Sequence, residues 1–244
     1  MNQKEWFAEW FDTSYYHQLY QNRNEEEAAL FIANLLQFLN LPKSSNLLDL
    51  ACGKGRHSVT LNSHGYEVLG VDLSPKSIQQ ASQFKNESLS ISTQDMREVI
   101  ENKTFDAIFN LFTSFGYFDD ESENEKVCAS IAKMLAPKGK LIIDFMNAEK
   151  VIQNLIENEV KIVGDLAFNL ERRYDGKHIY KDIRFQDNGQ DFHFTERVQA
   201  LKLADFTRLL QTDFNILATF GTFDLQAYSP TASDRLIIIA ERKI

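Results

Sequence analysis

The chain has 244 residues, of which 43% are hydrophobic and 25% are charged. This mixture excludes an intrinsically disordered chain, and the length suffices for one substantial core with an appended subdomain. The formal net charge is −9 and the 26 basic residues are scattered singly, which argues against nucleic acid or an anionic membrane as the main partner.

The cysteines and the amino-terminal sequence indicate which cellular compartment and which kinds of site to expect. Cys52 and Cys128 lie far apart and form no C-x-x-C pair, so neither a disulfide framework nor a zinc site is indicated, and we expect no metal. No run of about 18 apolar residues occurs. The stretch MNQKEWFAEWFD is acidic and aromatic, unlike a signal peptide. These features predict a cytoplasmic protein without a transmembrane segment.

The first 44 residues are predicted to form a helical cap. Residues 5–21 are rich in aromatic side chains and favour one or two short helices. A longer helix is expected from about Asn24, a suitable N-cap with glutamates in the following turn, and Pro42 closes the segment.

From residue 46 the sequence predicts strands that alternate with helices. The strand candidates are short apolar runs at Asn46–Leu50, Tyr66–Val71, Ser88–Thr93, Phe105–Leu111 and Lys140–Phe145. Helices are expected between them at 55–64, 75–85 and 121–136. Runs without polar alternation indicate strands buried on both faces, as in a parallel sheet covered by helices. Right-handed crossovers then give a doubly wound α/β sandwich, with a core at 45–157 and 200–244.

Residues 158–199 depart from this alternation. Three extended segments are joined at Asp175-Gly176 and Asn188-Gly189, which are strong hairpin signals because both residue types tolerate positive φ. We therefore expect an inserted antiparallel β meander. A helix at Ala204–Gln211 and strands near Asn215–Phe223 and Arg235–Glu241 return the chain to the core.

The turn after the first strand, Asp49-Leu-Ala-Cys-Gly-Lys-Gly55, is the first candidate binding element. Its glycines allow a ligand to lie against bare backbone at a helix amino terminus. No P-loop motif is present, and a dinucleotide fingerprint would need glycine where Ser58 stands. A pyrophosphate would be repelled by Asp49, which suits a cationic ligand better; the alternative is that Asp49 merely caps the turn.

Two later acids extend this site. Asp72 ends the second strand, where an acid in an open α/β sheet accepts hydrogen bonds from a ribose diol. Asp72 could instead cap the next helix, although Ser74 is better placed for that. Asp95 and Met96, after the third strand, are placed to receive an adenine through a carboxylate and an apolar side chain; this is the weaker prediction, since aspartate is common after strands.

The ordered series DLACGKG, EVLGVDLS, QDM, FDAIFNLF and LAPKGKLIIDF resembles the class I S-adenosylmethionine-dependent methyltransferases over residues 45–146. The resemblance implies a Rossmann-like, seven-stranded, mostly parallel sheet with an antiparallel last strand. It also implies S-adenosylmethionine as cofactor and S-adenosylhomocysteine as product. The residues that would contact the cofactor are Asp49, Ala51, Cys52, Gly53, Gly55, Asp72, Leu73, Asp95, Met96, Asn110, Leu111 and Phe112.

Within that family the resemblance is slightly greater to small-molecule members such as the glycine and sarcosine N-methyltransferases. In those proteins a helical amino-terminal segment closes over the cofactor, and here Tyr16, Tyr20 and Arg23 would serve, with Arg23 meeting the methionine carboxylate. Met146 stands where the glycine enzyme has a substrate-binding arginine, which argues against glycine as the acceptor.

Methyl transfer from a sulfonium needs little beyond alignment and a deprotonated acceptor, so no universal catalytic residue is expected. The acceptor site should lie past the carboxyl ends of the fourth and fifth strands, beneath the amino-terminal segment and the meander. The main candidates are Tyr16, Ser114, Tyr117, Asn147, Arg173 and His178. Further candidates are Thr113, Phe115, Asp144, Arg172, Tyr174 and His193, and any single residue of the meander is more often a surface or packing residue.

The sequence therefore predicts methyl transfer to a nitrogen or oxygen atom of a small-molecule acceptor, by a monomer or homodimer that binds neither nucleic acid nor membrane. The base-amine motif N/D-P-P-[YF] is missing, and NLFTSF stands instead. One alternative is a catalytically silent adenosylmethionine-binding sensor or partner protein. A second, an NAD-dependent oxidoreductase, is disfavoured by Ser58 and Asp49.

Overall fold

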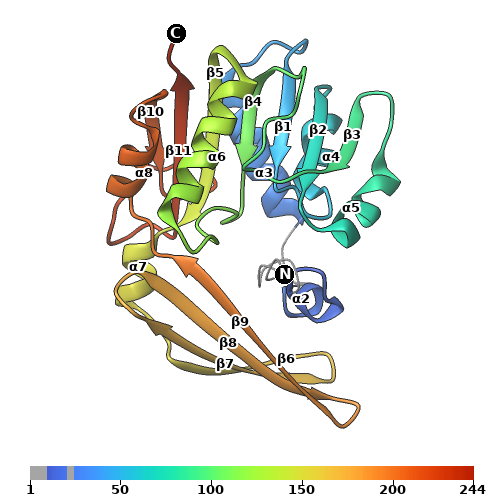
Figure 1. Cartoon of the computed structure of the whole chain (residues 1–244), viewed down its shortest axis with the longest axis vertical. Helices are drawn as coiled ribbons and strands as arrows, with labels where there is room; N and C mark the ends of the chain where they lie inside the picture. Colours follow the sequence, from blue (N-terminus) through green and yellow to red (C-terminus); the bar gives the residue numbers. More distant parts are fainter. Residues whose placement is uncertain (1–9, 21–24) are drawn as a thin grey trace.

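A computed structural model describes residues 10–20 and 25–244 of the chain. Seven strands form the main sheet in the order β10-β11-β5-β4-β1-β2-β3 (Figure 1). Their bounds are β1 (Asn46–Leu50), β2 (Glu67–Asp72), β3 (Leu89–Thr93), β4 (Phe105–Asn110), β5 (Leu135–Met146), β10 (Phe214–Phe220) and β11 (Arg235–Arg242). β11 pairs antiparallel with both β5 and β10, whereas the other pairings are parallel. The predicted sheet with one reversed strand is confirmed.

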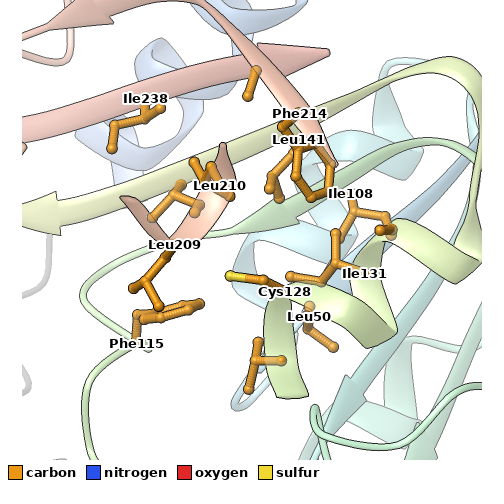
Figure 2. Close-up of a cluster of buried hydrophobic side chains, with 14 of the residues drawn as sticks. Leu50, Ile108, Phe115, Cys128, Ile131, Leu141, Leu209, Leu210, Phe214 and Ile238 are labelled. Carbon is orange, nitrogen blue, oxygen red and sulfur yellow. The ribbon is translucent and has the colours of Figure 1, made fainter. Parts of the chain in front are cut away.

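Helices cover both faces of this sheet. One face carries α6 (Glu121–Met134) and α8 (Leu203–Leu210), and Figure 2 shows their side chains packed on Leu50, Ile108 and Ile238. The other face carries α3 (Glu25–Leu39), α4 (Arg56–Ser63), α5 (Pro75–Ala81) and the 3₁₀ turn η1 (Ser82–Phe84). Burial on both faces explains the unbroken apolar strands of the sequence.

Helix α3 packs differently from the cap to which the sequence assigned it. Its residues Phe31, Ile32 and Leu35 are buried against Leu47 and Ile237 of the main sheet. An apolar face at helical spacing does not reveal which surface it will cover, so the sequence pattern could not distinguish a cap from a core helix.

The inserted segment forms a separate antiparallel sheet in the order β6-β7-β8-β9. Its strands are β6 (Asn158–Val163), β7 (Leu166–Tyr174), β8 (His178–Asp187) and β9 (Gln190–Gln199), and α7 (Ala148–Gln153) leads into it from β5. The sequence predicted three of these strands and missed the turn at Gly164-Asp165, where Gly164 has a φ of 59°. Figure 1 shows this sheet below the carboxyl end of the main sheet.

Residues 10–20, which include α2 (Ser14–Leu19), are called the strap here. The strap lies beside the inserted sheet (Figure 1), and Trp10 and Leu19 are buried against its apolar face. Trp10 packs on Phe194 with ring centroids 4.5 Å apart. The inserted sheet thus obtains a small core of its own by covering the strap.

Among the helices in the described part of the chain, none is long and apolar enough to cross a membrane.

Candidate functional site

A cavity of about 740 Å³ lies past the carboxyl ends of the main-sheet strands. Most of the residues that line it fall into three groups, and α4, α5 and η1 contribute the rest: Arg56, His57, Val59, Thr60, Ser77, Gln80, Gln83 and Phe84. The turn after β1 and the ends of β2 and β3 contribute Ala51, Cys52, Gly53, Lys54, Asp72, Leu73, Gln94, Asp95 and Met96. The loop after β4 contributes Leu111, Phe112, Thr113, Ser114, Tyr117 and Phe118, and the strap contributes Phe11, Tyr16, His17 and Tyr20. The crevice at the carboxyl edge is where open α/β sheets bind ligands.

The turn after β1 presents bare backbone to this cavity. Ala51 and Gly53 both adopt left-handed conformations, with φ of 65° and 56°. A Cβ atom added at Gly53 would meet nothing within 4 Å, so this glycine faces open space. A Cβ atom added at Gly55, in contrast, would lie 3.1 Å from the Cβ of Ala81, and Gly55 lies outside the lining, so it is a packing residue between α4 and α5.

Asp72 is held by the same turn. Its Oδ2 accepts the backbone N–H of Gly53 at 2.9 Å, and its Oδ1 accepts that of Ser74 at 2.8 Å. Burial raises the pKa of Asp72 above its ordinary value, although these two N–H groups oppose the shift. Each carboxylate oxygen has a further lone pair, so Asp72 can accept two more hydrogen bonds from a ligand in the cavity.

Asp95 lines the cavity but is already engaged in an ion pair. The guanidinium of Arg97 lies 2.5 Å from its Oδ2, and Arg97 also pairs with Glu123 at 2.9 Å. Burial acts to raise the pKa of Asp95, but its hydrogen bonds with Arg97 outweigh burial and hold it below the ordinary value. The carboxylate is therefore fixed and ionised at neutral pH.

Asp49 lies beneath the turn and is not among the cavity-lining residues. It is buried, and the hydroxyl of Ser58 donates to its Oδ2 at 2.6 Å. Burial raises its pKa to about 6, with the Ser58 hydrogen bond opposing and the charge of Asp72 adding to the shift. The sequence analysis expected Asp49 to face a cationic ligand. In the structure Asp49 instead has a protein partner, Ser58, and does not line the cavity.

Cys52 is buried at the edge of the cavity. Burial raises the pKa of its thiol well above the ordinary value, and Asp49 and Asp72 add to this shift through their negative charge. The thiol stays protonated, so Cys52 forms part of the cavity wall and does not act as a nucleophile.

The loop after β4 is strained and firmly held. Phe112 and Thr113 have consecutive left-handed φ values of 63° and 61°, which are costly for residues with a Cβ, most of all for a β-branched one. The carboxylate of buried Asp144 accepts the N–H of Phe112 at 2.8 Å, and its main-chain carbonyl accepts the N–H of Thr113 at 2.9 Å. Arg235 donates to Asp144 at 2.7 Å and to Thr113 Oγ1 at 3.0 Å.

Asn110, at the end of β4, is buried immediately before this loop. Its Nδ2 donates to the carbonyl of Leu50 at 3.0 Å. Its Oδ1 is buried and finds no donor among the described residues. An unsatisfied buried acceptor is uncommon in folded proteins and points to a missing donor.

The strap contributes an aromatic wall. Phe11 and Tyr16 have ring centroids 4.8 Å apart, and Phe11 meets Tyr117 of the β4 loop at 5.4 Å. The carboxylate of Glu196 in β9 accepts Trp10 Nε1–H at 2.7 Å and the hydroxyl of Tyr20 at 2.7 Å. Close to Trp10, the hydroxyl of Ser74 donates to Asp12. The wall is thereby tied to the inserted sheet and to the loop after β2.

Several predicted site residues lie elsewhere. Asn147 is buried and donates to the carbonyls of Pro230 and Ser233, so it fixes the loop before β11. Arg173 lies over the ring of Tyr180 at 3.7 Å, on the inserted sheet. His178 is buried in that sheet, 3.6 Å from Asp175. Arg23 and Asn24 fall outside the described residues. The remaining candidates outside the lining are Asn110, Phe115, Asp144, Arg172, Tyr174 and His193.

The cavity also contains residues that the sequence reasoning did not select. His17 lies on α2 between Tyr16 and Tyr20, and Lys54, Arg56 and His57 follow the glycine turn. The cations could have been found from their positions, because a turn that opens a ligand site places the first residues of its helix beside the ligand.

Comparison with known proteins agrees with this geometry. Residues 47–139 match a family model described as a methyltransferase domain. Glycine N-methyltransferase of Mus musculus is 31% identical over 152 residues, which cover 55% of this chain and 52% of the mouse protein. The dTDP-3-amino-3,4,6-trideoxy-alpha-D-glucopyranose N,N-dimethyltransferase of Streptomyces venezuelae is 29% identical over 131 residues, 53% of this chain and 54% of that protein. The chain thus spans about half the length of these curated relatives.

A solved structure extends the likeness to the whole chain. The crystal structure of an S-adenosylmethionine-dependent methyltransferase from Clostridium acetobutylicum ATCC 824 has a TM-score of 0.80 and covers 94% of this chain and 96% of its own. At 21% sequence identity, this comparison shows a shared fold.

Proposed function

We propose that this chain is a class I S-adenosylmethionine-dependent methyltransferase and that it transfers a methyl group from S-adenosylmethionine to a nitrogen atom of a small-molecule acceptor. The observation that carries this proposal is the continuity of the cavity. The turn after β1 and Asp72 line one end, while the strap and the β4 loop line the other. Its volume of about 740 Å³ is of the size that small-molecule and cofactor sites have.

The residues at the first end fit the cofactor. Asp72 has lone pairs left for two ribose hydroxyls, and Gly53 leaves open space beside the turn. Asn110, whose buried Oδ1 is unsatisfied within the described part of the chain, precedes the lining residue Leu111 but does not itself line the cavity. Leu73 and Met96 offer apolar cover for the adenine ring. Asp95 would accept the adenine amino group only with the lone pairs that Arg97 leaves.

When bound, the cofactor supplies a methyl group on a positively charged sulfur, which a nucleophile displaces in line. The chain's contribution is alignment and exclusion of water. The strap closes the acceptor end with Phe11, Tyr16 and Tyr20, and its ties to Glu196 and Ser74 hold these rings in place. The strained β4 loop fixes Thr113 and Ser114 beside them.

The choice of nitrogen rests on the relatives. The mouse relative is named for methylation of glycine nitrogen, and the Streptomyces relative is named for methylation of an amino sugar. Since Met146 replaces the arginine expected for glycine, we propose a larger amine without a required carboxylate.

The test has two stages. Calorimetry should give a measurable affinity for S-adenosylmethionine and S-adenosylhomocysteine and none for NAD. The protein is then incubated with methyl-labelled S-adenosylmethionine and separate panels of small amines and small alcohols, and S-adenosylhomocysteine is quantified. Label in an amine supports the proposal, and label confined to alcohols moves the acceptor atom to oxygen. Tight cofactor binding without product from either panel favours a catalytically silent binding protein.

A further inference from the structure

Of two neighbouring hydroxyl groups in the β4 loop, one is left free to donate a hydrogen bond and the other is left free to accept one. Thr113 and Ser114 both line the cavity, beside the aromatic wall of the strap. Each makes one hydrogen bond within the protein, and the chemistry of its partner fixes which role the hydroxyl plays.

Thr113 can only accept from its partner. Arg235 Nη2 lies 3.0 Å from Thr113 Oγ1, and a guanidinium has no lone pair with which to accept. The proton of Thr113 must therefore point elsewhere, and no recipient for it lies among the described residues. Thr113 presents a hydrogen-bond donor.

Ser114 can only donate to its partner. Its Oγ lies 2.9 Å from the main-chain carbonyl of Leu111, which has no proton to give. The single hydroxyl proton is thereby used, and Ser114 has only lone pairs for another group. A donor and an acceptor thus stand side by side.

The polarity of Thr113 is set by groups that do not line the cavity. Asp144 is 1% exposed and holds Arg235 through its Oδ1 and the N–H of Phe112 through its Oδ2. Arg235 also lies over the ring of Phe223, 5.8 Å from its centroid. Because the guanidinium is held on two sides, it cannot turn away from Thr113 without leaving Asp144 unpaired, which is costly for a buried charge.

From this arrangement we propose that Thr113 and Ser114 recognise a neutral group of the methyl acceptor that carries both a lone pair and a proton, a hydroxyl or a primary carboxamide, with Arg235 as the positioning residue. A carboxylate offers only lone pairs and would face those of Ser114. A hydrocarbon would leave the Thr113 proton and the remaining lone pair of Ser114 without a partner. This inference rests on the proposed function and names the class of acceptor, a hydroxyl- or carboxamide-bearing amine.

The test uses four amines on one ring: 2-aminocyclohexanol, 2-aminocyclohexanecarboxamide, 2-aminocyclohexanecarboxylate and cyclohexylamine. Binding of each to the full chain saturated with S-adenosylhomocysteine is measured by ligand-observed NMR. We expect the alcohol or the carboxamide to bind best. Comparing the alcohol with the carboxamide shows which of the two groups is preferred. Because binding is measured, the result tests the inference without requiring methyl transfer. Tightest binding of the carboxylate or of cyclohexylamine, or no binding of the two neutral polar amines, overturns it.

Variants locate the preference. Thr113→Val keeps the β-branched shape and removes the donor, and Ser114→Ala removes the acceptor. Each should weaken binding of the preferred amine roughly fivefold to tenfold, the cost of one hydrogen bond, and should leave cyclohexylamine and S-adenosylhomocysteine unchanged. The matched controls are Thr207→Val and Ser63→Ala, whose exposed hydroxyls bond to carbonyls elsewhere and should leave the preference intact. An unchanged preference in Thr113→Val overturns the inference.

Arg235→Lys tests the positioning role. A lysine can still neutralise Asp144 but lacks the second nitrogen that reaches Thr113, so the preference should shrink while the fold is kept. Neutron diffraction of the wild-type complex gives an independent readout. The Thr113 deuteron should point into the cavity, and a deuteron directed at a protein carbonyl would refute the assignment.

Discussion

The hydroxyl of Ser58 donates a hydrogen bond of 2.6 Å to the carboxylate of Asp49, beneath the turn that opens the ligand cavity. Both residues are buried, with exposures of 0% and 1%. This pair explains how an acid can be kept at the end of a buried strand, and it has consequences for stability and for packing.

The first prediction concerns pH. Burial raises the pKa of Asp49 from 3.8 to about 6, so the folded chain binds this proton more tightly than the unfolded chain. The stabilisation is complete below about pH 4 and is lost as the pH rises through about 6. Asp49→Asn has no such proton. The free energy of unfolding of wild type relative to Asp49→Asn should therefore fall by roughly 2–3 kcal/mol between pH 4 and pH 7.

Urea unfolding of both proteins across this range measures the difference. The control is Asp106→Asn. Asp106 accepts the N–H of Asn46 at 2.8 Å, at the amino ends of β1 and β4 and so at the opposite end of the strands from the cavity. Parallel curves for wild type and Asp49→Asn would show that Asp49 has an ordinary pKa.

The second prediction concerns cofactor affinity. Asp72→Ala removes the carboxylate that we assign to the ribose hydroxyls and also releases the N–H groups of Gly53 and Ser74. Affinity for S-adenosylhomocysteine, measured by calorimetry, should fall by about 1–3 kcal/mol. Asp106→Ala likewise loses a bond to a backbone N–H, but far from the cavity, and should bind normally. Equal affinities in wild type and Asp72→Ala would remove Asp72 from the site.

The sequence predicted the parts of the fold that local pattern determines. The strands of the main sheet are apolar runs, and the turn at Asn188-Gly189 has φ values of 50° and 77°, as its residue types require. That Ala51, Gly53 and Asp72 line the cavity was predictable for the same reason, since they lie at or just after the ends of strands.

The acceptor end depends on contacts between distant segments, which no local pattern encodes. Thr113 accepts a hydrogen bond from Arg235, which lies 122 residues later in the sequence. Tyr20 donates a hydrogen bond to Glu196, which lies 176 residues later. Residues of the inserted sheet were expected to point into the cavity, yet Arg173 and His178 contact neighbours within that sheet. Period-two alternation assigns residues to two faces and does not say which face meets the ligand.

The third prediction concerns close packing of α4 on β2. A Cβ added at Gly70 would lie 2.6 Å from Ser58 Oγ and 2.7 Å from Ile91 Cδ1. In a dinucleotide-binding fold, close packing of helix on strand uses a glycine in the helix, where Ser58 stands here. In this chain the glycine that allows close packing is Gly70, in the strand. Gly70→Ala should lower the free energy of unfolding by about 1–3 kcal/mol.

A double-mutant cycle identifies the cause. Ser58→Ala removes one of the two clashing atoms, so Gly70→Ala should cost less in that background than in wild type, and urea unfolding of the four proteins gives the coupling. Additive costs would assign the whole clash to Ile91.

The fourth prediction concerns the strap. Glu196 accepts hydrogen bonds from Trp10 and Tyr20 and lies 3.7 Å from the ammonium of Lys181. Glu196→Ala removes the carboxylate that accepts from both donors and that neutralises the partly buried ammonium, which keeps the Tyr20 hydroxyl as an acceptor. Because hydrogen bonds to a charged group contribute about 1.5–3 kcal/mol, the strap should open at least tenfold more often. Hydrogen exchange at the N–H of Tyr16, which bonds to Thr13 within the strap, reports this opening.

The main sheet should be unaffected, because the strap packs mainly on the inserted sheet. Exchange at the N–H groups of β1 and β4 should therefore stay slow in Glu196→Ala. Glu171→Ala is the matched control: Glu171 belongs to the same sheet, but its ion pair with Arg184 at 2.9 Å is half exposed, and such pairs contribute little. S-adenosylhomocysteine should also dissociate faster from Glu196→Ala than from Glu171→Ala if the strap retains the ligand. Equal exchange at Tyr16 in the two variants would show that apolar packing of Trp10 and Leu19 alone holds the strap closed.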